Sequence, residues 1–327
     1  MISYNKIKII VITLAITVSI NTNALTVSPA RIEISGNSGQ TLSGEINIYN
    51  EQPEVKTFYT SYENFQSSDD SGAPKFIGSE NGLATWIKTE SSIAVNSEEK
   101  KVLPFTISIP ADAEPGGYFA AVFLGSQPPA NAEGGTVSIG GKIGILVLLR
   151  VNGDIKEGAG LAEFGTQNKK RFFSNLPISL IYKVNNSGGD RIVPIGDIKI
   201  KNTIRLNSAT INLNEGKGSV LPGSVRKFEA VWGKNSDEKI KAEKEKTFFE
   251  SAMFQLKNFH LGVYTAKINM TWGEGKTNVD SDSFTFFVIP WQLFLILFVV
   301  LLVVTFFGRI ILRKYNKYII SQAKLTQ

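Results

Sequence analysis

The side chains that most often carry catalysis are scarce in this sequence. It contains one histidine, His260, and no cysteine. A serine–histidine–aspartate triad would have to use His260, and a zinc site would need carboxylate or solvent ligands beside it. His260 directly precedes a Gly-Val-Tyr strand pattern, so we interpret it as a turn residue, with a catalytic role as the alternative. Without cysteine, thiol catalysis and disulfide bonds are excluded.

Two further patterns resemble binding loops only in part. The segment 134–142 (GGTVSIGGK) lacks the Gly-x4-Gly-Lys spacing of a phosphate-binding loop, and Ile143 replaces the residue that would hold magnesium, so we expect a hairpin loop. Pairs of acidic residues occur at Asp69-Asp70 and at Asp280-x-Asp282. Neither pair has the glycine and distal glutamate of an EF-hand loop, so we expect solvated turns rather than calcium sites.

One compact basic and aromatic cluster lies in the body of the chain. Lys169, Lys170 and Arg171 directly precede Phe172 and Phe173. Clustered cations raise the local concentration of an acidic partner, so these three basic residues are the candidate contact for an anionic polymer. The alternative, which we favour, is a loop at a domain junction with both aromatic rings packed inward. Exposed sheet edges are another candidate, because an edge strand can accept a partner strand, but the sequence does not identify a free edge.

The two ends of the chain predict export and membrane anchoring. Residues 1–24 combine two lysines, an uncharged apolar stretch and a small-residue end, which is the pattern of a signal peptide; an uncleaved anchor is the alternative. Residues 288–308 are long and apolar enough for a transmembrane helix, with a buried core helix as the alternative. Residues 309–327 carry five basic residues and no acidic one. We therefore expect a cytoplasmic C-terminus and an N-terminus outside.

The positive charge is concentrated at these ends. Seven of the 35 lysines and arginines flank the two apolar runs, which leaves 28 in the body against all 29 acidic residues. The formal net charge of +6 therefore gives no support to nucleic-acid binding.

The body has the hydrophobic pattern of antiparallel sheets, with apolar residues at every second position between segments rich in Gly, Asn, Pro and Ser. This pattern predicts an all-β protein with two tandem immunoglobulin-like β-sandwich domains, residues 25–152 and 153–287. The segment 236–257 is the exception, because its helix formers predict a helix or a long polar excursion. The alternating runs are 42–48, 103–109, 118–124, 143–151, 178–184 and 264–270.

The two halves also share short patterns in the same order. Residues 116–122 and 262–268 both read Gly-x-Tyr-x-Ala-x-Val/Ile, and an earlier alternating run ends in Asn50 in the first half and in Asn186 in the second. A terminal asparagine suits a strand that leaves a sheet through a turn, because its side chain can bond nearby backbone. We favour a duplicated unit over coincidence between amphipathic strands.

This order of segments resembles the WxL-interacting-type surface proteins of bacteria. The most similar stretches are residues 186–200 (NSGGDRIVPIGDIKI) and 115–125 (PGGYFAAVFLG). The resemblance implies a peptidoglycan-binding first domain and a second domain that binds a host or partner protein. Bacterial pilus chaperones share the sandwich and a Pro-x-Arg-like first strand, here 29–31, but they are soluble whereas this chain carries a membrane segment.

Together these features predict a membrane-anchored bacterial cell-surface protein that binds or scaffolds without catalysis. The expected partners are a cell-wall polymer or another surface protein, with the membrane contacted through the C-terminal helix. No cofactor, metal or nucleic acid is expected. Two alternatives stay open: a chaperone-like assembly module that exchanges strands, and an extracytoplasmic hydrolase.

Overall fold

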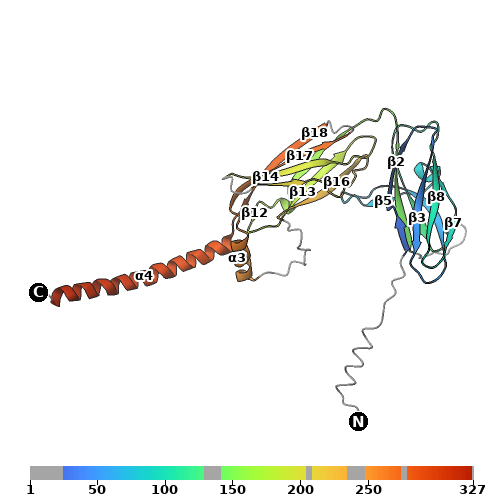
Figure 1. Ribbon diagram of the computed structural model, residues 1–327. Helices are drawn as coiled ribbons and strands as arrows, with labels where there is room; N and C mark the ends of the chain where they lie inside the picture. Colours follow the sequence, from blue (N-terminus) through green and yellow to red (C-terminus); the bar gives the residue numbers. More distant parts are fainter. Residues whose placement is uncertain (1–24, 129–140, 204–207, 234–246, 274–277, 326–327) are drawn as a thin grey trace, which may run out of the picture. The chain divides into compact units, whose positions relative to one another are not determined.

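The computed structural model describes residues 25–128, 141–203, 208–233, 247–273 and 278–325 (Figure 1). The chain divides into two compact units, Met1–Gln66 with Pro74–Ile155, and Ser67–Ala73 with Lys156–Gln327. The predicted signal peptide and most of the glycine-rich segment before Lys142 lie outside the described residues. The prediction of a mostly β protein with one apolar C-terminal helix is confirmed.

The first unit contains two β-sheets and a short helix, α2 (Leu83–Trp86). The four-stranded sheet has the order β1 (Leu25–Ser28), β3 (Thr41–Asn50), β8 (Lys100–Ser108), β6 (Ile87–Thr89). The other sheet has the order β2 (Arg31–Gly36), β10 (Lys142–Val151), β9 (Gly116–Gly125), β4 (Lys56–Ser67), β5 (Pro74–Phe76), with β7 (Ser92–Val95) also paired to β4. The consecutive strands β1 and β2 therefore pair in different sheets.

Alternate side chains of these strands form the core of the first unit, as the period of two predicts. Ile46 and Ile48 of β3 are at most 1% exposed, and so are Ile145, Val147 and Leu149 of β10. Burial of each such side chain contributes about 1.5–3 kcal/mol.

The second unit also contains two sheets. The three-stranded sheet has the order β11 (Ala159–Thr166), β13 (Ile178–Asn186), β16 (Ser224–Trp232). The five-stranded sheet has the order β12 (Phe172–Phe173), β18 (Asn278–Val288), β17 (Gly262–Trp272), β14 (Ile195–Asn202), β15 (Ser208–Asn212). Tyr182, Tyr264 and Phe286 are the largest fully buried side chains of its core. A one-turn helix, η1 (Gln167–Lys169), leads into β12.

The helix expected within 236–257 is confirmed for its last part. Helix α3 spans Phe248–Lys257, and residues 236–246 lie outside the described chain. Thr247 begins the helix with a capping box: its hydroxyl oxygen accepts a hydrogen bond from the Glu250 N–H, and the Glu250 carboxylate accepts one from the Thr247 N–H. Two of the unpaired N–H groups at the helix start are thereby satisfied.

The apolar C-terminal helix, α4 (Trp291–Leu325), begins later than the expected span 288–308. Val288 is instead the last residue of β18, where it pairs with Gly262. An apolar run does not distinguish a buried strand from a membrane helix by periodicity alone, which explains this error. The uncharged residues 291–308 form the apolar part of α4. They belong to the stretch Trp291–Ile320, in which no residue is buried in protein and which is long enough to cross a membrane.

Candidate binding edge on strand β10

Strand β10 has a stretch of backbone that no described strand covers on one side. On its other side β10 pairs with antiparallel β9 along its whole length, beginning at Lys142↔Gly125. The parallel neighbour β2 covers β10 only from Leu146 to Val151. Within the described chain, the four residues Lys142–Ile145 therefore form a free edge, termed here the β10 edge.

The alternation of the strand shows which backbone groups point to this open side. The Leu146 N–H donates a hydrogen bond of 3.1 Å to the Ala30 carbonyl, so Leu146 directs its backbone groups toward the β2 side. Residues two and four positions earlier direct theirs the same way. The N–H and C=O groups of Gly144 and Lys142 consequently point to the open side, where an extended partner segment can form backbone hydrogen bonds with them.

The surface around the β10 edge is apolar with one positive charge. Ile143 is 36% exposed. The ring of Phe123 lies beside Gly144, where an added Cβ would come within 2.9 Å of it. Phe123 also meets Phe76 edge-on at 4.9 Å between ring centroids, and Lys142 Nζ lies 5.8 Å from the centre of the Phe123 ring. Glycine at 144 thus leaves room for the Phe123 ring, which is 9% exposed.

Other uncovered strand segments are less suited to receive a partner strand. The segment Lys100–Pro104 of β8 carries two lysines and a proline, and β16 carries Arg226, Lys227 and Glu229. Charged residues and proline on an edge discourage strand addition. Strand β15 is uncharged but contacts β16, and β1, β5, β6 and β12 are only two to four residues long. The edge strand β2 carries Arg31 and Glu33, and the edge strand β11 carries Glu163 and contacts β18. Among these segments the β10 edge is the strongest candidate.

His260 lies in the connection between α3 and β17, which agrees with the interpretation as a turn residue. Its Nδ1 is 3.1 Å from the carbonyl oxygen of Asn258. Its ring meets the Trp232 ring edge-on, with 5.6 Å between centroids. These contacts pack the imidazole against the core of the second unit.

Asp69 and Asp70 lie in a turn, as expected. The turn prediction is wrong for Asp280 and Asp282, because both lie in strand β18, which pairs with β17 at these positions. A carboxylate oxygen of Asp69 accepts a 2.8 Å hydrogen bond from the Ser71 N–H, and hydrogen bonds from the Ser71 side chain and backbone hold the pKa of Asp69 below its usual value. Asp280 accepts a 2.7 Å hydrogen bond from the Leu161 N–H. In the part of the chain that the structure describes, no three His, Asp or Glu side chains come together as a metal site.

The basic cluster Lys169, Lys170 and Arg171 is exposed. The Thr166 hydroxyl donates to the Lys170 carbonyl, and Lys170 Nζ lies 5.2 Å from the centre of the Phe173 ring. The expectation that both aromatic rings pack inward is wrong for Phe172, which is 62% exposed. Successive side chains of a strand point to opposite faces, so only Phe173 reaches the core.

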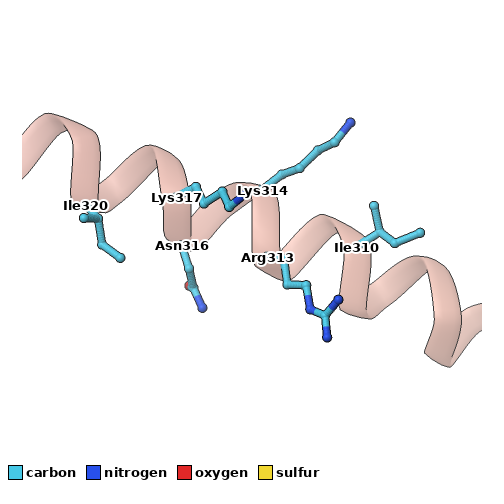
Figure 2. Close-up of a pocket in the computed structure, with 6 residues that line it drawn as sticks. All are labelled: Ile310, Arg313, Lys314, Asn316, Lys317 and Ile320. Carbon is cyan, nitrogen blue, oxygen red and sulfur yellow. The ribbon is translucent and has the colours of Figure 1, made fainter.

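Figure 2 shows a shallow hollow near the C-terminal end of α4. It is lined by Ile310, Arg313, Lys314, Asn316, Lys317 and Ile320. All six side chains come from one helix, and no other described element forms a wall, so the hollow is the surface of a lone helix. Its basic residues follow the uncharged part of the helix.

The sequence predicted strand 143–151 but not its free edge. Strands β2 and β10 are more than a hundred residues apart in the chain. Their parallel register, which leaves four residues of β10 uncovered, is a long-range feature that local periodicity does not encode. The glycine at 144 inside an apolar run was the one available signal, because glycine in a strand often marks close approach of another group.

No family model and no curated protein matches this chain. Solved structures that resemble it at low similarity include chaperones of fimbriae. The class 5 fimbriae chaperone CfaA is 11% identical with a TM-score of 0.37, covering 82% of this chain and 100% of that chain. The CupB2 chaperone of Pseudomonas aeruginosa is 8% identical with a TM-score of 0.34, covering 80% and 100%. We infer no function from these likenesses, and the resemblance to WxL-interacting-type proteins stays a prediction.

Proposed function

We propose that this chain is a membrane-anchored, non-catalytic binding protein whose first unit holds an extended segment of another polypeptide along the β10 edge. The observation that supports the proposal is the uncovered backbone of Lys142 and Gly144 beside an apolar surface. This function corresponds to the strand-exchange alternative predicted from the sequence more closely than to polymer binding.

Backbone hydrogen bonds would supply affinity that depends little on the partner's sequence, and side-chain contacts would supply selectivity. The exposed Ile143 favours an apolar residue in the partner, and Lys142 favours a nearby acidic group. Each backbone hydrogen bond contributes about 0.5–1.5 kcal/mol net, so four residues of edge support a weak or transient contact unless further surface joins it.

Helix α4 would anchor this binding unit in the membrane. Its apolar part is followed by Arg313, Lys314 and Lys317, and the positive-inside rule places such an end in the cytoplasm (Figure 2). With an N-terminal signal peptide, both units would lie outside the membrane. The exposed basic cluster Lys169–Arg171 supports a second candidate function, contact with an anionic cell-wall polymer.

A photo-reactive amino acid at Ile143 tests the proposal in cells that make the full chain. The matched control is the same amino acid at Asn47, an exposed residue of β3 that is paired on both sides, with Ser28 and with Val102. We expect discrete protease-sensitive adducts from position 143 and none from position 47. Equal adducts at both positions, or adducts removed by a cell-wall hydrolase but not by protease, would contradict strand binding.

Two substitutions at Lys142 distinguish the contribution of its backbone N–H to partner binding from that of its charged side chain. Lys142→Pro removes an N–H on the open side at the first residue of the strand, where proline is tolerated. Lys142→Ala removes the charge but keeps that N–H. We expect the adducts from position 143 to disappear with proline and to persist with alanine. Persistence with proline would show that the edge backbone does not carry the contact.

A further inference from the structure

Helix α3 uses one of its faces to hold the start of α4. Phe248 meets Trp291 with 5.9 Å between ring centroids, and Ala252 and Gln255 are 4% and 1% exposed. These three positions recur at spacings of four and three residues, which places them on one stripe of the helix. Figure 1 shows α3 beside the first turn of α4.

The buried amide of Gln255 fixes this junction. Its Oε1 accepts a 3.2 Å hydrogen bond from the Leu293 N–H, and its Nε2 donates to Oε1 of Gln292. The first N–H groups of a helix have no partner within the helix, so Gln255 satisfies one of them from outside. The position of α3 is thereby tied to the point where the apolar part of α4 begins.

A second stripe of α3 is apolar and open to solvent. Phe249, Met253 and Leu256 are 75%, 55% and 59% exposed. Each follows a residue of the first stripe by one position, so the second stripe lies about 100° around the helix from the first. The polar residues Glu250 and Lys257 lie further around the helix. Exposure of three neighbouring large apolar side chains to water is unfavourable in free energy. An apolar stripe of this kind indicates a site that binds a partner.

The lipid bilayer is the partner that the surroundings of the stripe favour. The helix that carries the stripe is bonded to the first turn of α4, whose side chains are apolar and exposed, and Trp291 at that turn is 52% exposed. Tryptophan at such a position is typical of a membrane–water interface. An amphipathic helix placed there buries its apolar side by about 5–10 Å at the boundary of headgroups and acyl chains. The ten residues hold one acidic and one basic side chain, so their attraction to lipid is apolar rather than electrostatic.

We propose that α3 is an interfacial helix that inserts Phe249, Met253 and Leu256 into the outer leaflet beside the membrane entry of α4. The proposal rests on the proposed anchoring by α4. It adds a second membrane contact, which would hold the second unit close to the bilayer surface rather than on a free stalk.

The absence of cysteine allows a direct test with single-cysteine variants of the full chain. An environment-sensitive fluorophore would be attached at Phe249→Cys, Met253→Cys or Leu256→Cys, and the protein reconstituted into phosphatidylcholine vesicles without other proteins. Lys257→Cys on the polar side of α3 is the matched control. Phe298→Cys in the middle of the apolar part of α4 reports the anchoring itself. Quenchers are placed on the lipid either near the headgroup or near the acyl-chain end.

We expect blue-shifted emission at the three stripe positions, with stronger quenching from the shallow quencher than from the deep one. The label at position 257 should emit as in water, and the label at position 298 should be quenched best by the deep quencher. Deep quenching at 298 with water-like emission at 249, 253 and 256 would overturn the interfacial helix alone. Water-like emission at 298 would overturn the anchoring, and the interfacial helix with it.

Discussion

Asn50 and Asn186 end equivalent strands of the two units with the same hydrogen bonds. Both side chains are fully buried. Each amide nitrogen donates to the carbonyl four residues later, and each amide oxygen accepts from the N–H two residues later. The distances are 2.9 Å to Glu54 and 3.1 Å from Gln52 for Asn50, and 2.8 Å to Asp190 and 2.9 Å from Gly188 for Asn186.

Each asparagine also reaches a second segment of its own unit. The amide nitrogen of Asn50 donates to the Val95 carbonyl at 3.1 Å, and that of Asn186 donates to the Val220 carbonyl at 2.9 Å. The shared pattern supports a duplicated unit. In both places one side chain joins the end of a strand to a turn and to a distant segment.

We expect Asn186→Ala to lower the free energy of unfolding of the second unit by about 2–3 kcal/mol, because it removes three hydrogen bonds made by a fully buried side chain. Urea unfolding of a fragment that keeps all of β18, residues 25–290, measures this loss. Asn185→Ala, at the exposed neighbouring position, is the control and should change the stability by less than about 0.5 kcal/mol. Equal losses from both variants would remove the special role of Asn186.

Period-two alternation and the terminal asparagines were enough to predict the β fold and the strand ends at Asn50 and Asn186. The same periodicity failed at Val288, because a buried strand and a membrane helix are both continuously apolar. It also could not assign Phe172 to the exposed face, since that strand has only two residues. The β10 edge and the stripe on α3 depend on which elements pack together, and single-sequence patterns do not determine that.

Gly44 gives a test of core packing in the first unit. It occupies a core-facing position of β3, and an added Cβ would lie 2.4 Å from Cζ of Phe105, whose ring is 2% exposed. Overpacking of this kind costs about 1–3 kcal/mol, so Gly44→Ala should lower the melting temperature of the first unit. Gly165→Ala in β11 is the control, because its added Cβ meets no described atom within 4 Å. A neutral Gly44→Ala would mean that the Phe105 ring moves aside without cost.

Tyr182 predicts a loss of stability at high pH. Burial raises its pKa to about 12, and its hydroxyl oxygen accepts a 3.0 Å hydrogen bond from the Asn214 N–H. An unfolded tyrosine has a pKa of about 10, so between about pH 10 and 12 the folded state keeps a proton that the unfolded chain releases. The free energy of unfolding should therefore fall with rising pH there, by at most about 1.4 kcal/mol per pH unit, and be independent of this group below pH 9.

Denaturant titrations of the fragment 25–290 between pH 8 and about 12 measure this slope. Lysines also titrate in this range, so the informative quantity is the difference between the wild-type chain and Tyr182→Phe, which should show a shallower decline. Parallel curves for the two proteins would show that Tyr182 does not cause the pH dependence.

The exposed basic cluster predicts salt-sensitive binding of an anionic polymer. Lys169, Lys170 and Arg171 form no ion pair among those identified in the described chain, so their charges are available to an acidic partner. Each exposed ion pair contributes about 0.5 kcal/mol, so replacing all three by glutamine should weaken binding of a purified anionic wall polymer about tenfold at low salt. Screening at 1 M salt shortens the Debye length to about 3 Å and should bring both proteins to the same affinity.

A second triple variant tests whether the location of the three charges, and not only the net charge of the unit, determines polymer binding. The control replaces three other exposed lysines on the five-stranded sheet of the same unit by glutamine: Lys199, Lys201 and Lys267. It changes the net charge by the same amount as the cluster variant. If the cluster is the contact, the control keeps most of the affinity and its salt dependence, because its charges lie outside the contact. Equal weakening by both triple variants would show that the polymer responds only to the overall charge of the unit. No binding by the wild-type chain at low salt would exclude the cluster as a polymer site and leave the β10 edge as the candidate contact.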